Sequence, residues 1–187
     1  MNKKLLAAVT LLALSTAASA QVYGVISLGT ARLDIDCAGA TKCDKSGTAV
    51  KLLGGYKFTP NLAAEVGYFG LGKASVADAG TSLDITNTGF GGGVAYHQDL
   101  GAAWSFVGRL GLASVKTKLN ASVSSLGSGG DSDTNVQPYG GLGIGYKLGK
   151  STTLDAAWDV SKAKYSKNGV EESGSINAFS LGLTIGF

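Results

Sequence analysis

The chain ends in the stretch Phe179-Ser180-Leu181-Gly182-Leu183-Thr184-Ile185-Gly186-Phe187, in which bulky apolar residues alternate with small ones. Successive side chains of a β-strand point to opposite faces of a sheet, so an alternation with period two predicts a strand with unlike faces. One face of this strand is wholly apolar, and the other carries only small residues. The sequence therefore predicts a two-faced strand at the C-terminal end.

The same alternation recurs along the rest of the chain. In residues 136–147, for example, Leu142 and Ile144 oppose Gly141 and Gly143. Polar interruptions rich in Gly or Ser separate the alternating segments, as expected between strands. Eight strands are predicted, over residues 22–34, 48–58, 62–75, 88–98, 102–117, 136–147, 152–165 and 175–187.

The connections between these segments alternate in length. Short ones cover residues 59–61, 99–101 and 148–151, and longer ones cover residues 35–47, 76–87, 118–135 and 166–174. Consecutive strands joined in this way favour an all-β, antiparallel, up-and-down barrel. An even number of strands places both chain ends at the same end of the barrel, beside the short turns.

Residues 1–20 have the three parts of a secretory signal peptide. Lys3 and Lys4 are followed by an apolar run over residues 5–14 and by the small residues Ala18, Ser19 and Ala20. The run is too short to span a bilayer as a helix, and the small residues fit a cleavage site. We expect an exported protein whose mature chain, residues 21–187, is a single β-barrel domain.

Charge and hydropathy argue against a nucleic-acid-binding protein and against membrane-spanning helices in the mature chain. Without Lys3 and Lys4, 14 of the 16 basic residues remain against 13 acidic ones, so no nucleic-acid partner is indicated. After residue 14, no apolar run approaches the roughly 18 residues that a membrane helix needs. If the mature chain spans a membrane, it has to do so with strands.

The position of the charges predicts which face of the barrel meets lipid. A soluble barrel buries its large apolar side chains inside and points its charges outward. Here the charges lie on the face that carries the small residues, which leaves the bulky apolar face for lipid. We therefore predict an eight-stranded transmembrane β-barrel with a packed, ion-paired interior. The predicted interior charge network consists of Lys51, Lys57, Glu65, Arg109, Lys147, Asp155 and Asp159.

Aromatic residues are expected to form two girdles at the membrane surfaces. The girdle near the short turns would include Tyr23, Tyr56, Phe58, Tyr96, Trp104, Tyr146 and Phe187, and the other would include Tyr68, Phe90, Trp158 and Phe179. The register of the first strand stays open, because both of its faces carry apolar residues.

These features together resemble the small outer-membrane barrel superfamily that is typified by the OmpA-like transmembrane domain and its opacity-protein and OmpX-like relatives. The resemblance covers residues 21–187. It implies the outer membrane of a Gram-negative bacterium, with membrane lipid and lipopolysaccharide around the barrel and both chain ends in the periplasm. Because nothing follows Phe187, the peptidoglycan-binding domain of full-length OmpA-type proteins is not expected.

The last strand carries the most specific part of this resemblance. It looks like the signal that the barrel assembly machinery reads, which alternates apolar residues and ends in an aromatic one. The resemblance therefore implies the assembly machinery and periplasmic chaperones as partners. The residues that carry the expected assembly signal are Phe179, Leu181, Leu183, Ile185 and Phe187.

Cys37 and Cys43 are the only cysteines, and they lie in one predicted long connection of an exported chain. An oxidising compartment favours a disulfide between them. A metal site would need more ligands than the nearby Asp34, Asp36 and Asp44 supply. We expect neither a metal nor a cofactor.

The only histidine, His97, bears on possible enzymatic activity. With Asp99 it has the spacing of a general base and the group that orients it, but the pair lies beside a short turn. Small barrels that act as lipid A deacylases, acyltransferases or proteases place a histidine near the outer surface, where this chain has none. We therefore expect no enzyme.

Three functional hypotheses follow. The leading one is a non-enzymatic outer-membrane protein that supports envelope integrity or surface interaction through its extracellular loops. The alternatives are a narrow, porin-like ion channel and a lipid A-modifying enzyme. Lys162, Lys164 and Lys167 are candidates for contacts with the phosphates of lipopolysaccharide.

Overall fold

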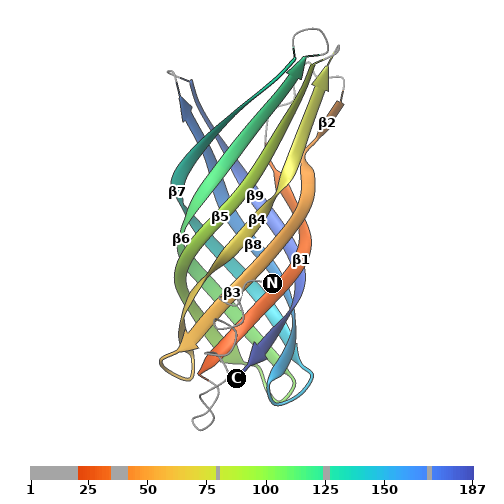
Figure 1. Cartoon of the computed structure of the whole chain (residues 1–187). Coiled ribbons are helices and arrows are strands. Elements are labelled where there is room, and N and C mark those ends of the chain that lie inside the picture. The colour runs from red at the N-terminus through yellow and green to blue at the C-terminus, as the bar shows by residue number, and fades with distance from the viewer. Residues whose placement is uncertain (1–20, 35–41, 79–80, 124–126, 168–169) are drawn as a thin grey trace, which may run out of the picture.

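A computed structural model gives the fold and describes residues 21–34, 42–78, 81–123, 127–167 and 170–187. Eight long antiparallel strands close into a barrel, which confirms the predicted fold class (Figure 1). Each long strand pairs with its neighbours in sequence, and β1 closes the wall against β9. The strands are β1 (Val22–Leu33), β2 (Lys42–Asp44), β3 (Ser46–Lys57), β4 (Leu62–Asp78), β5 (Thr81–Asp99), β6 (Trp104–Val123), β7 (Gly127–Lys147), β8 (Thr152–Lys167) and β9 (Val170–Gly186). The three-residue β2 lies beside β4.

Side-chain burial alternates along the strands and settles the register that the sequence left open. In β1, Val25 is buried inside the barrel, whereas Ile26 and Leu28 are more than half exposed on its outer face. In β6, Leu110 is 69% exposed and its neighbour Arg109 only 4%. The apolar residues therefore cover the outer wall, and the charges lie within it, as the sequence predicts.

The predicted aromatic girdles face outward with one exception. Tyr56, Tyr96 and Tyr146 are about half exposed near the short turns. Tyr23 was predicted among them, but its side chain is only 3% exposed and lies inside the barrel. The prediction for Tyr23 is wrong because β1 has apolar residues on both faces, so its pattern does not distinguish the two.

The long connections predicted from the sequence are strands for much of their length. The ladder between β5 and β6 runs without a break to the pair Thr81 and Val123, and the one between β6 and β7 continues to Gly127. We call the strand ends farthest from the short turns the arms, over residues 73–78, 81–86, 116–123, 127–134, 162–167 and 170–175. The arms rise beyond the rest of the barrel in Figure 1. Burial still alternates at the start of the second arm, where Thr117 is buried between the exposed Lys116 and Lys118, but the outward residues there are polar.

A β-bulge marks the start of the first arm. The register between β4 and β5 shifts between Gly70 and Lys73. Gly72 has a φ of 87°, a backbone conformation that favours glycine because it has no Cβ.

The wall opens between β7 and β8 within the arms. Pairing between these strands stops at Tyr139 and Ser161, next to Pro138, which has no N–H to donate. Lys147 donates its N–H to Ala103, on the side of β6. Successive amides of a strand point in opposite directions, and the ladder between β6 and β7 has no bulge, so the even-numbered amides of β7 point away from β6. Among the described residues, the part of β7 before Tyr139 therefore has a backbone ladder with β6 alone.

Two aspartates in this part of β7 bind amides of the same strand. Asp131 accepts the N–H of Ser132, and Asp133 accepts the N–H of Thr134, both at 2.8 Å. We call this stretch, residues 131–138, the capped edge. Acidic side chains and proline are features that keep sheet edges from pairing with other strands.

Candidate functional site

The interior of the barrel is built around a buried ion pair between β6 and β4. Arg109 donates its Nε–H to Glu65 Oε2 at 2.9 Å, and Tyr23 donates its hydroxyl to Glu65 Oε1 at 2.7 Å. Glu65 is 1% exposed, and its partners across the ladder are Gly55 and Gly93; a Cβ at Gly55 would collide with the ring of Tyr23. Both carboxylate oxygens therefore have a donor, as a buried charge requires.

A second ion pair lies across the barrel. Lys51 on β3 donates to Asp159 on β8 at 2.5 Å, and both side chains are largely buried. Gly141 makes this arrangement possible, because a Cβ there would collide with the Asp159 carboxylate. Two cations and two carboxylates thus balance one another within the wall.

An apolar layer lies next to these ion pairs on the side of the arms. The rings of Phe69 and Tyr139 pack with their centroids 5.0 Å apart, and Leu71 and Ile176 are buried with them. The cavity between these groups has a volume of only about 20 Å³, which is room for a single water molecule. Among the described residues, the interior is packed at this level.

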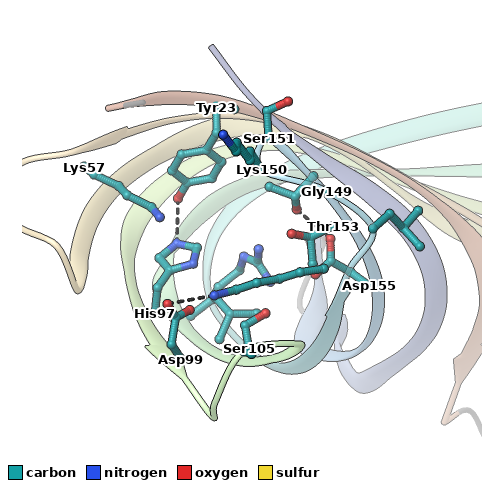
Figure 2. A pocket seen from close by; sticks show the side chains of 17 residues that line it. Tyr23, Lys57, His97, Asp99, Ser105, Gly149, Lys150, Ser151, Thr153 and Asp155 are labelled. Carbon is teal, nitrogen blue, oxygen red and sulfur yellow. Dashed lines mark hydrogen bonds and ion pairs between the residues drawn. The ribbon is translucent and has the colours of Figure 1, made fainter. Parts of the chain in front are cut away.

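At the short-turn end, the interior widens into a cavity of about 660 Å³ (Figure 2). We call it the vestibule. His97 lies in its wall, and its Nε2 is 3.0 Å from the hydroxyl oxygen of Tyr23. Because that hydroxyl donates its proton to Glu65, Nε2 has to carry the proton of the imidazole and donate it. A chain of hydrogen bonds thus runs from the vestibule to the buried Glu65.

The seven predicted network residues fall into two groups. Arg109 with Glu65, and Lys51 with Asp159, form the two buried pairs. The other three, Lys57, Lys147 and Asp155, line the vestibule.

The three vestibule residues have separate partners. Lys147 Nζ lies 2.8 Å from Asp99, Asp155 accepts the hydroxyl of Thr184 at 2.6 Å, and Lys57 Nζ lies 5.8 Å above the ring of Tyr23. The predicted single network is therefore divided between the barrel centre and its short-turn end.

Sequence reasoning missed the roles of Tyr23 and His97. The sequence spacing places His97 beside Asp99, but in the structure Asp99 pairs with Lys147 and His97 with Tyr23. The available signal was the alternation of Tyr23 with Val25, which puts the tyrosine on the inner face once the register is known.

The residues of the expected assembly signal lie on the outer face of β9 and at the chain end. All five are at least one third exposed, which leaves them accessible from outside the wall; their role in assembly stays a prediction. They are Phe179, Leu181, Leu183, Ile185 and Phe187.

Several predictions fall partly or wholly outside the described residues. The structure does not describe residues 1–20 or Cys37, so the signal peptide and the disulfide between Cys37 and Cys43 stay predictions. Within the described ranges, no group of acidic, histidine or cysteine side chains could hold a metal ion. No helix there is long and apolar enough to cross a membrane.

Comparison with known proteins supports the architecture. The family model described as outer membrane protein beta-barrel domain matches residues 5–187. No curated protein sequence matches the chain.

Three solved structures illustrate the likeness, each 16% identical to this chain. Neisserial surface protein A has a TM-score of 0.64, with 89% of this chain and 97% of that one covered. Ail, the attachment invasion locus protein of Yersinia pestis, has a TM-score of 0.55, with 89% and 99% covered. The outer membrane protein OprG of Pseudomonas aeruginosa has a TM-score of 0.52, with 90% and 97% covered.

Proposed function

Because the chain belongs to the outer membrane protein β-barrel domain family, we propose that it is a non-enzymatic, closed barrel that serves as a platform for its arms. In this proposal the short turns and both chain ends lie in the periplasm, and the arms carry surface interactions or support the envelope from outside. The fold alone is compatible with many roles, so the proposal depends on the interior and the arms.

The packed interior is the observation that carries the platform proposal. Two buried ion pairs and the layer of Phe69 and Tyr139 fill the barrel at successive levels. An eight-stranded barrel has an interior just wide enough for side chains to fill. A lumen filled in this way favours a rigid support over an ion channel.

The arms supply the interaction surface. A transmembrane strand needs about 9–11 residues, and β6 and β7 have 20 and 21 residues. About half of each strand therefore extends past the membrane, and in β6 this half exposes Lys116, Lys118 and Asn120 on its outer face.

Planar-bilayer conductance of the refolded mature protein is the experiment that tests the platform proposal. We expect a silent membrane, because the buried ion pairs and the layer of Phe69 and Tyr139 fill the described interior. Heat-dependent gel migration of the same sample would establish beforehand that the barrel is folded. Steady openings of a single size would contradict the platform and favour the channel hypothesis.

A ring of cations lies just beyond the apolar band and supports lipopolysaccharide as a partner. Arg32, Lys116 and Lys162 are exposed, and each follows an outward apolar residue of its strand by four positions. This spacing puts all three on the outer face, at the level expected for lipid phosphates. Lys164 and Lys167, proposed for the same contacts, continue β8 into the arm.

Lys73 lies in the same zone but is already neutralised. Its Nζ is 3.0 Å from Asp84, which also accepts the hydroxyl of Ser75 at 2.6 Å. Hydrogen bonds from Ser75 and Lys73 hold the pKa of Asp84 below its ordinary value, so this carboxylate stays charged beside Lys73.

Replacing both Lys116 and Lys162 by Gln is expected to raise the Kd for lipopolysaccharide about thirtyfold, because each charge near a phosphate surface contributes on the order of 1 kcal/mol. Binding would be measured by titrating lipopolysaccharide into the detergent-refolded protein. The same titration with lipopolysaccharide that lacks its lipid A phosphates is the control, and there the variant and the parent should bind alike. If the variant and the parent bind phosphorylated lipopolysaccharide with equal affinity, Lys116 and Lys162 do not contact its phosphates.

A further inference from the structure

The vestibule is a polar cavity with one closed end. Its walls come from seven strands and the turn between β7 and β8, and Arg109 is among the residues that line it. The volume of about 660 Å³ falls within the range of small-molecule sites. The buried ion pairs lie behind it, so a molecule that enters from the short-turn end does not pass through the barrel.

Cations outnumber carboxylates in this cavity. Its lining holds four cationic side chains, Lys57, Arg109, Lys147 and Lys150, against the carboxylates of Asp99 and Asp155. Lys147 pairs with Asp99, and Arg109 pairs with Glu65 behind the cavity wall. Outside these two pairs, the lining has the positive charges of Lys57 and Lys150 and the single negative charge of Asp155, which accepts a hydrogen bond from Thr184.

Hydrogen-bond donors also converge on the cavity. Arg109 has five N–H donors, and the bond to Glu65 uses only Nε. The hydroxyl groups of Ser105 and Thr153 lie in the wall at the same end, and Figure 2 shows Lys57 extending toward Tyr23 and His97. Gly145 keeps this part of the wall open, because a Cβ there would collide with Ser105 and Asp155.

We propose that the vestibule binds a phosphate group presented from the short-turn end, either on a small solute or on the headgroup of a phospholipid. A phosphate group offers several acceptor oxygens and at least one negative charge, which suits a cavity lined by guanidinium, ammonium and hydroxyl donors. Such a site goes beyond the platform function and does not depend on what the arms bind.

The first experiment uses inorganic phosphate as the probe and NMR of the full barrel in octyl glucoside, which contains no phosphate. We expect saturable shifts of the amide signals of Ser105 and Thr153. In the Lys57→Gln/Lys150→Gln variant the Kd should rise about tenfold, as expected for the loss of two partly screened charge interactions. Lys118→Gln removes an exposed charge from an arm and is the matched control, with the Kd unchanged.

The second experiment distinguishes the two sources of phosphate. The protein would be reconstituted in vesicles of phosphatidylglycerol and phosphatidylcholine, extracted in octyl glucoside and weighed by native mass spectrometry. A phosphatidylglycerol molecule retained by the parent and by Lys118→Gln, but lost from Lys57→Gln/Lys150→Gln, identifies a headgroup site. Phosphate binding without retained lipid identifies a site for a soluble phosphate compound. If the parent binds neither, or if Lys57→Gln/Lys150→Gln binds as the parent does, the proposal is wrong.

Discussion

Arg109→Ala is expected to lower the free energy of unfolding by about 3–5 kcal/mol, the cost typical of removing one partner from a buried ion pair. Glu65 is 1% exposed and would lose the cation at 2.9 Å while its carboxylate stayed within the barrel. The hydrogen bond from Tyr23 satisfies only one of its two oxygens. The measurement is urea unfolding of the protein refolded in lipid vesicles, with linear extrapolation to water.

Two further variants distinguish the lost charge balance from lost packing. Glu65→Gln/Arg109→Met removes both charges and should recover much of the stability, because no unpaired charge remains. Lys147→Ala breaks a pair whose side chains are 29% and 69% exposed, and should cost less than about 1 kcal/mol. If Arg109→Ala lowers the free energy of unfolding no more than Lys147→Ala does, the pair of Arg109 and Glu65 contributes little to stability.

Leu110→Arg is expected to destabilise the barrel by about 2–4 kcal/mol, the cost of an arginine on the lipid face near the middle of a membrane. Leu110 is 69% exposed on the outer wall, and it lies between the girdle residue Trp104 and the cation Lys116 on the same strand. In water such a substitution at an exposed site would change stability by about 0.5 kcal/mol or less.

Ser114→Arg is the matched control for this prediction. Ser114 is exposed on the same face of β6, four residues closer to the arm and two before Lys116. Its cost should fall to about 0–1 kcal/mol, because arginine near the membrane surface reaches water and phosphates. Both variants would be unfolded with urea from vesicles, and equal costs at the two positions would contradict the assigned depth of Leu110.

The sequence predicted the membrane-spanning part of the fold because lipid and a narrow interior act on opposite faces of each strand. Arg109 beside Leu110, and Glu65 beside Val66, show this contrast at single-residue spacing. The pattern weakens in the arms, where the outer face no longer meets lipid: Lys116 and Lys118 are exposed there, although Thr117 between them is only 5% exposed. There the strands depend on backbone pairing with their neighbours, which a hydropathy pattern does not report.

The sequence predicts which charged residues lie inside the barrel, but not which of them form ion pairs with each other. Burial of Lys51, Glu65, Arg109 and Asp159 follows from the position of charges on the small-residue face. Which cation meets which carboxylate depends on how the strands are staggered around the barrel, and eight separate segments do not specify it. The same information was needed to bring Tyr23 of the first strand against His97, 74 residues later.

The capped edge has a consequence for assembly in a crowded membrane. An edge strand whose backbone amides are unpaired can form a ladder with the edge strand of a neighbouring chain, and partly assembled barrels expose such edges. In this protein, Asp131 and Asp133 occupy two of the outward amides, and Pro138 has none to offer at the point where the wall divides. Between Asp131 and Pro138, β7 therefore offers fewer open amides with which the strand of a neighbouring chain could pair.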